Sequence, residues 1–249
     1  MKTLIANGCS HTAGTETDPD NVKQCPDRAW AKFVADHHKL EYINLADPGA
    51  GNEQISRSTI LFLSNLIDRK GVDPKDLVVT ILWSGFNRYE YWSDQYKKIK
   101  SFALTTVMGF DPGETVRKYI EYRSLVEPKN YSYYKNLYYV FTTAKFLESH
   151  GIKYYFANGL ESFLHPGHIE DKEIKEIYCE MLDLYGGKRI DNHLGFFDNN
   201  DSFRSFLQST PRSTYGRKTH WDVVGQKKYA EFFIKHMERV DADPRNKRT

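Results

Sequence analysis

The stretch Leu77-Val78-Val79-Thr80-Ile81-Leu82-Trp83 decides the fold, because it is apolar on both of the faces that a strand presents. A strand with one face in water alternates apolar and polar residues, and this stretch does not. The pattern is typical of a central strand in a parallel sheet that helices cover on both sides.

Shorter apolar runs on either side of this strand predict three more strands, over 3–6, 42–46 and 153–158. Between and after the strands, apolar residues at helical spacing predict helices over 30–38, 52–71, 131–150, 169–184 and 222–240. Strands that alternate with helices predict an α/β fold: a three-layer α/β/α arrangement around a mostly parallel central sheet.

The 249 residues, 40% of them hydrophobic, are enough for one domain with a sizeable core, and no linker composition divides them. We therefore expect a single domain over residues 1–249. Residues 92–130 have a weak pattern and exceed an ordinary connection between a strand and a helix, so we expect a helical insertion there. Residues 186–219 are polar and are interpreted as a loop.

Composition and charge exclude several classes of protein. With 35 basic and 33 acidic residues the net charge is +2, which disfavours a nucleic-acid partner. No apolar run is long enough to cross a bilayer, so no membrane partner is expected. Three widely spaced cysteines, Cys9, Cys25 and Cys179, fit neither a disulfide framework nor a metal site. The first residues lack the features of a signal peptide, and a cytoplasmic location is the expectation.

Polar and glycine residues follow the predicted strands, and the carboxyl ends of parallel strands are where such sheets place their sites. Ser10 follows the first strand, and a serine hydroxyl becomes a nucleophile when a base lies within hydrogen-bond reach. His220, just before the last helix, can point back over that edge of the sheet. Gly49 and Asn87 follow the second and third strands and offer the N–H donors that an oxyanion hole needs.

Each of these four residues also has a purely structural interpretation. Ser10 can cap a turn, and His220 can be one of nine histidines lying on a surface loop. Pro48-Gly49 suits a type II turn, and Asn87 is a common turn residue. The joint order of the four residues and their placement at strand ends are much more specific than any one of them.

In this order and placement the residues resemble the signature blocks of the SGNH (GDSL-type) serine hydrolases. The matching blocks are Gly8-Cys9-Ser10, Asn44 to Gly49, Gly85 to Arg88 and His220 to Gly225. Cys9 and Arg88 each stand where that family usually has Asp. The resemblance covers residues 1–100 and 215–240, and these variant blocks are most similar to SGNH-type proteins of phages and bacteria that have no settled substrate.

The resemblance implies a flavodoxin-like fold and a serine esterase that needs no metal and no organic cofactor. Ser10 would be the nucleophile of an acyl-enzyme intermediate, and His220 would be its base. The backbone N–H groups of Ser10 and Gly49 and the amide of Asn87 would form the oxyanion hole. The implied substrate is a small molecule or glycan that carries a small acyl ester, for instance a carbohydrate O-acetyl group.

One departure from the family pattern leaves three alternatives open. The family usually carries Asp three residues before the histidine, where this chain has Arg217. A backbone carbonyl can orient His220, another carboxylate can do so, or the protein has kept the fold as a binding or structural protein without the chemistry. The candidate carboxylates are Glu161, Asp191, Asp198 and Asp201, with Asp222 interpreted instead as the N-cap of the last helix.

A group of tyrosines at helical spacing has a simpler interpretation than a stacking surface for sugars or bases. Aromatic residues with this spacing more often belong to the core. The residues concerned are Tyr131, Tyr133, Tyr134, Tyr138 and Tyr139.

Overall fold

The computed structural model describes residues 1–15, 17, 24–93, 98–103, 113–128, 130–185, 192–197, 203–209, 220 and 222–244. At its centre lies a five-stranded sheet in which all neighbouring strands are parallel. In spatial order the strands are β2 (Glu41–Asn44), β1 (Thr3–Gly8), β3 (Leu77–Trp83), β6 (Lys153–Asn158) and β7 (His193–Leu194).

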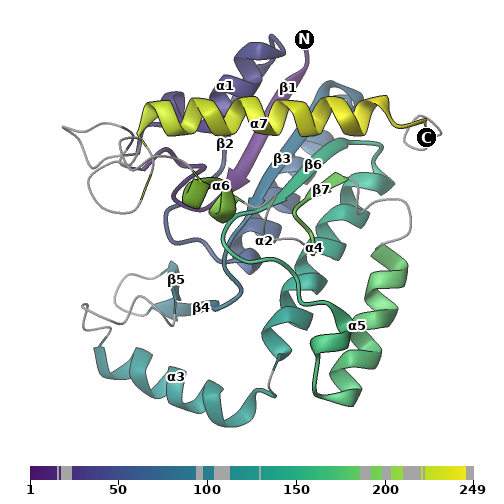
Figure 1. The fold of residues 1–249 in the computed structure, drawn as a ribbon. Helices are drawn as coiled ribbons and strands as arrows, with labels where there is room; N and C mark the ends of the chain where they lie inside the picture. Colours follow the sequence, from purple (N-terminus) through teal and green to yellow (C-terminus); the bar gives the residue numbers. More distant parts are fainter. Residues whose placement is uncertain are drawn as a thin grey trace.

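Helices cover both faces of this sheet and produce the three layers that the sequence predicts (Figure 1). The helices are α1 (Trp30–His37), α2 (Asn52–Ser64), α3 (Gly113–Val126), α4 (Tyr131–Ser149), α5 (Lys172–Tyr185), α6 (Phe203–Ser209) and α7 (Val223–Ala242). Among the described residues no helix is both long and apolar enough to span a bilayer.

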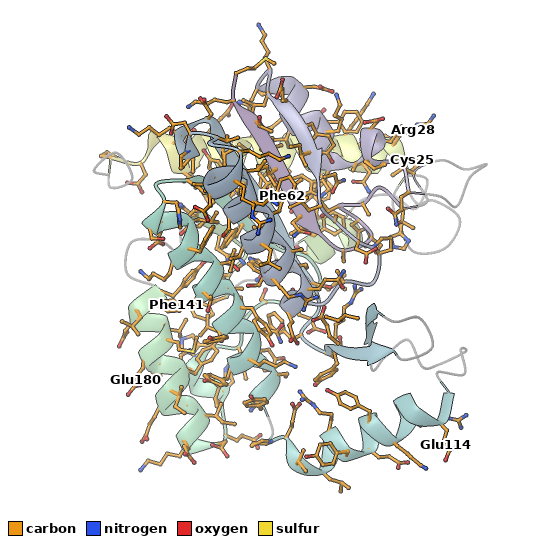
Figure 2. The ribbon with its side chains drawn as sticks, turned by 180° about the vertical axis from the view of Figure 1, so that it is seen from behind. Cys25, Arg28, Phe62, Glu114, Phe141 and Glu180 are labelled. Carbon is orange, nitrogen blue, oxygen red and sulfur yellow. The ribbon has the colours of Figure 1, made fainter. Side chains whose placement is uncertain are left out.

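Two hydrophobic cores lie on opposite faces of the sheet because successive side chains of each strand point to opposite faces. Ile81 and Phe156 face α2, α4 and α5, whereas Leu82 and Tyr155 face α1 and α7. Figure 2, seen from behind, shows α2 with Phe62, α4 with Phe141 and α5 with Glu180 on the near side of the sheet. Every residue of β3 is buried, which confirms it as the central strand.

Two segments differ from what the sequence predicts. The expected helical insertion over 92–130 overlaps an antiparallel hairpin of β4 (Arg88–Ser93) and β5 (Lys98–Ala103), and among its described residues only those of α3 are helical. Tyrosine and tryptophan at neighbouring positions of β4 favour a strand on a pleated surface. The expected loop over 186–219 contains β7 and α6. β7 and α6 are each too short to show a hydrophobic periodicity in the sequence.

The strand order predicts a ligand-binding site between the ends of β1 and β3. In doubly wound sheets of this order, ligands bind where neighbouring strands send their connections to opposite faces. Here β1 pairs with β3 up to Gly8 opposite Leu82, while α1, which follows β1, and α4, in the connection after β3, lie on opposite faces. The residues that follow β1 and β3 therefore meet at one edge of the sheet, which is where Ser10 and Asn87 occur.

Candidate active site

The turn that carries Ser10 is pressed closely against the neighbouring strand. Gly8 has a φ of +157°, and a Cβ atom there would lie 2.4 Å from Thr12 Oγ1 and 2.9 Å from the Leu82 carbonyl oxygen. Only glycine fits such an approach of backbone to backbone. The chain then turns, with the Ala13 N–H donating to the Cys9 carbonyl at 3.0 Å and the Thr15 N–H to that of Ser10 at 3.0 Å.

The side chain of Asn7 anchors this turn through hydrogen bonds. Its Nδ2 donates to Ser58 Oγ and Thr59 Oγ1 of α2, each at 2.8 Å, and its Oδ1 accepts from the Gly8 N–H at 2.8 Å. Asn7 and Thr59 are fully buried, so these bonds are made away from water. The end of β1, and with it Ser10, is thereby held against α2.

The structure brings His220 and Ser10 together across 210 residues of sequence. His220 Nε2 lies 2.7 Å from Ser10 Oγ. Two residues later Asp222 caps α7, because its Oδ1 accepts from the N–H groups of Val224 and Gly225 at 2.9 Å each. This is the N-cap that the sequence predicts, and it occupies that carboxylate oxygen away from His220.

The side chain of Gln226 links the first turn of α7 to the segment that bears Ser10. Its Nε2 donates to the His11 carbonyl at 3.3 Å, and its Oε1 accepts from the Trp30 N–H at 2.9 Å. The side chain is fully buried. One amide therefore joins α7, the turn after β1 and the start of α1, and sets where His220 lies relative to Ser10.

His11 belongs to the site, although the sequence analysis did not single it out. Its ring centroid lies 4.6 Å from that of His220 and 4.4 Å from that of Phe203. Burial, followed by the nearby His220 and Arg88, holds the pKa of His11 well below its usual range. His11 is therefore a neutral ring at pH 7. Its place directly after Ser10 was the available signal, but its contact with α6 could not be seen from the sequence.

Gly49 lies in the turn after β2, beside the turn after β1. It has a φ of +86°, and a Cβ atom there would meet nothing within 4 Å. The Asp47 N–H donates to the Gly8 carbonyl at 3.3 Å, and Asn44 Nδ2 donates to the Thr12 carbonyl at 2.7 Å. The positive φ alone accounts for a glycine here, and the open surroundings leave its backbone approachable.

Three side chains from three different elements hold the loop that bears Asn87. Asn52 Oδ1 accepts from the Ser84 N–H at 2.6 Å, and its Nδ2 donates to the Ser84 carbonyl at 3.2 Å. Asn136 of α4 donates to the Phe86 carbonyl at 3.2 Å, and its Oδ1 accepts from Asn52 at 2.7 Å. The loop is thus fixed to α2 and α4.

Glu161 is the third of these side chains. Its Oε2 accepts from the Phe86 N–H at 3.0 Å, so the structure places this candidate acid against the loop that bears Asn87. Asn is a favoured N-cap residue, but the cap of α2 is Gly51, and the Asn52 side chain binds the Ser84 backbone instead. For Asn52 a tertiary contact supplied a better partner than the local one.

Arg88 stands at the position where the SGNH pattern usually has Asp, and it links two of the blocks. Its Nη1 donates to the Ala50 carbonyl at 3.0 Å, one residue after Gly49. A Cβ atom on Gly51 would lie 3.2 Å from the Cβ of Arg88, so the two segments also pack closely. Arg88 therefore connects the segment that bears Gly49 to the one that bears Asn87.

The remaining residues considered in the sequence analysis are three aspartates and one arginine. Asp191, Asp198, Asp201 and Arg217 lie outside the described residues. Within the described ranges, no group of three or more His, Cys, Asp or Glu side chains is arranged to hold a metal ion. The described site therefore consists of Ser10, His220 and His11 with the segments of Gly49 and Asn87 beside them.

Replacing Asn52 with alanine is expected to lower the free energy of unfolding by about 3 kcal/mol, because the Ser84 N–H and C=O groups would be buried without their partner. Urea denaturation measures this change. The matched control is Asn65→Ala, at an exposed position that follows α2. Equal losses in the two variants would show that the Asn52 bonds do not support the loop.

Comparisons with known proteins agree on the fold. A family model described as a family of unknown function, DUF6071, matches residues 12–234. No curated protein matches the chain. Among solved structures, an acetyl xylan esterase, Est2A, from the rumen bacterium Butyrivibrio proteoclasticus is 12% identical with a TM-score of 0.52, covering 96% of this chain and 64% of that one.

Two further structures extend the comparison over complete chains. TesA is 11% identical with a TM-score of 0.47, covering 96% of this chain and 99% of that one. The lipase/acylhydrolase from Enterococcus faecalis is 11% identical with a TM-score of 0.43, covering 96% of both chains. The chain has the SGNH hydrolase-like α/β fold, and its structural neighbours are esterases and lipases of the SGNH/GDSL type.

Proposed function

We propose that this chain, which belongs to DUF6071, a family of unknown function, is a serine hydrolase that cleaves a small acyl ester. The observation that carries the proposal is the 2.7 Å separation between His220 Nε2 and Ser10 Oγ. This is the distance at which an imidazole can accept the proton of an attacking hydroxyl. Relatives in fold that are carbohydrate esterases make a carbohydrate O-acetyl group the favoured ester.

The reaction runs in two halves. In the first half Ser10 Oγ attacks the carbonyl carbon of the ester while its proton passes to His220 Nε2. The tetrahedral intermediate then expels the alcohol, which takes the proton from His220 and leaves an acyl group on Ser10. In the second half water loses a proton to His220, attacks the acyl carbon and releases the carboxylic acid, and Ser10 regains its proton.

The negative charge that develops on the carbonyl oxygen needs donors at the same edge of the sheet. We assign this role to the backbone N–H groups of Ser10 and Gly49 and to the side-chain amide of Asn87. Each such donor is worth about 3 kcal/mol of transition-state stabilisation in comparable enzymes. The hydrogen bonds of Asn52, Asn136 and Glu161 to residues 84 and 86 support this role, because they fix the loop before the reaction begins.

Packing within the described part of the chain contributes to the orientation of His220 in the proposal. The His11 ring contacts the His220 ring at a centroid distance of 4.6 Å, and the Asp222 cap fixes the backbone two residues further on. In the triad template the loss of the acid costs about 10⁴-fold in turnover. The proposal therefore predicts a slow enzyme unless a carboxylate from residues 186–219 takes that place.

A fluorophosphonate probe tests the proposal, because it phosphonylates a serine only where a base activates the hydroxyl and expels fluoride. We expect labelling of the wild-type chain at Ser10 and its loss in Ser10→Ala and His220→Ala, read by mass spectrometry of the labelled peptide. Ser149→Ala, at an exposed serine near the end of α4, is the matched control and should label fully. A wild-type chain that takes up no probe would favour the alternative of a binding protein that keeps the fold.

A further inference from the structure

A cavity of about 450 Å³ lies between α3, α4, the start of α2 and β4. Figure 2 shows side chains projecting between α3, near the labelled Glu114, and α4, which bears Phe141. Six tyrosines line the cavity, including four of the five that the sequence analysis assigned to the core. Two of these, Tyr131 and Tyr134, also pack on the core, whereas Tyr138 is 51% exposed. The core interpretation is therefore only partly right.

Two cations in the cavity share one aromatic ring. Lys135 Nζ lies 3.9 Å from the ring centroid of Tyr89, and Arg123 Cζ lies 4.8 Å from it. Burial, followed by the charge of Arg123, lowers the pKa of Lys135 to about 8. Most of the Lys135 side chains are therefore still charged at pH 7.

Neither cation is fully satisfied by the described part of the chain. No described carboxylate lies within ion-pair distance of Lys135, and no described group forms a hydrogen bond with its Nζ. Arg123 pairs with Glu127, but its Nε–H is buried and has no acceptor among the described residues. Buried donors without partners are costly, so this corner of the cavity favours an anionic group.

The acidic residues of the cavity limit which anion fits. Glu90 pairs with Arg57 at 2.5 and 3.2 Å, and Glu53 also lines the cavity. The four charged residues that line the cavity are two carboxylates and two cations, so the lining carries no net positive charge. Such a lining does not favour the dense charge of a polyphosphate and suits a ligand with one negative charge per sugar ring and many hydroxyl groups, which carboxylates and tyrosines can bind.

We propose that this cavity binds an acidic sugar ring, stacked on tyrosine with its carboxylate at Lys135 and Arg123. The inference rests on the proposed function and names its substrate class: an ester on a glycan that contains uronic acid residues. Tyr89 follows Asn87 by two residues and Glu53 follows Gly49 by four. Their Cα atoms are at most about 7 Å and about 14 Å from those of Asn87 and Gly49. A glycan held in the cavity thus passes close to the strand ends that bear the proposed oxyanion hole.

The test measures binding and does not require catalysis. The full chain carrying Ser10→Ala is titrated by calorimetry with a trigalacturonate and with the same trisaccharide whose carboxylates are methyl-esterified. We expect the charged trisaccharide to bind at least about tenfold more tightly than the neutral one. Failure of both to bind, or equal affinity for both, overturns the proposal, as does displacement of trigalacturonate by inorganic tripolyphosphate at equal concentration.

Two variants locate the binding in this cavity. Lys135→Met keeps the stem of the side chain and should abolish the preference for the charged trisaccharide, whereas Lys145→Met, on the same helix with its ammonium over the Phe141 ring, should retain it. Tyr138→Ala, at an exposed position, should weaken the binding of both trisaccharides about equally. Retention of the full preference in Lys135→Met contradicts the proposal. Labelling by the fluorophosphonate probe is independent of these results, so failure of the sugar site and failure of the hydrolase are distinguishable.

Discussion

Removal of either Ser10 or His220 is expected to lower the turnover of a small acyl ester at least about a hundredfold. In a complete triad the serine and the histidine each account for about 10⁶-fold of the rate. If no acid orients the histidine, about 10⁴-fold of this is absent from the start, and about a hundredfold then remains for the pair. A larger loss would show that His220 is oriented as well as in a triad. Steady-state hydrolysis of an aryl acetate measures the effect.

The double variant distinguishes a catalytic pair from two residues that merely shape the site. Groups that act as a unit give non-additive losses, so Ser10→Ala combined with His220→Ala should be no slower than either single variant. Ser149→Ala, whose hydroxyl lies at the far end of α4, is the control and should retain the wild-type rate. Losses that multiply in the double variant would contradict a shared proton transfer between Ser10 and His220.

The free energy of unfolding is expected to fall steeply as the pH drops from about 6.5 towards 4. Burial holds the pKa values of His11 and His193 well below the usual range and lowers that of His236 to about 4. Below pH 6.5 the unfolded chain therefore binds protons that the folded chain does not, and stability is lost as the pH falls. His236, with a pKa of about 4, contributes on the order of 2 kcal/mol by pH 5, and His11 and His193 add losses in the same direction. Urea denaturation at a series of pH values measures the slope.

His193 offers a specific check on this pH dependence. Its Nε2 lies 2.7 Å from Asn158 Oδ1, which can only accept, and its Nδ1 lies 3.2 Å from the Tyr185 hydroxyl. The neutral ring thus donates from Nε2 and accepts at Nδ1. His193→Gln should reduce the slope of unfolding free energy against pH by about one proton between pH 5 and 6. His37→Gln, at an exposed position, is the matched control, and equal changes in both variants would rule out this origin of the slope.

The elements that the sequence predicts correctly are those with local signals. The unbroken apolar run of β3 marks a central strand wherever it folds, and Asp222 before an amphipathic segment marks the start of α7. Strand ends in a parallel sheet share one edge, so Ser10 and Asn87 could be placed at that edge before any coordinates were known. The same reasoning placed His220 beside Ser10, because the N-cap of α7, Asp222, follows two residues later.

The features that the sequence did not reveal depend on partners distant in the chain. Asn52 has the local character of a helix cap, yet the backbone of Ser84 is the partner that it binds. Glu161 at a strand end could face a substrate, and only the folded loop shows that its Oε2 receives the Phe86 N–H. The cavity of tyrosines forms between helices whose relative placement no periodicity encodes, so spacing alone assigned those rings to the core.

The hydrogen bonds of the Gln226 amide determine when, during synthesis, the contact between Ser10 and His220 can form. Ser10 leaves the ribosome 210 residues before His220, and the helix that anchors His220 follows it. Because Gln226 joins α7 to the His11 carbonyl and the Trp30 N–H, the Ser10–His220 contact can form only after α7 has docked. A nascent chain thus carries the Ser10 hydroxyl without its proposed base until α7 is in place.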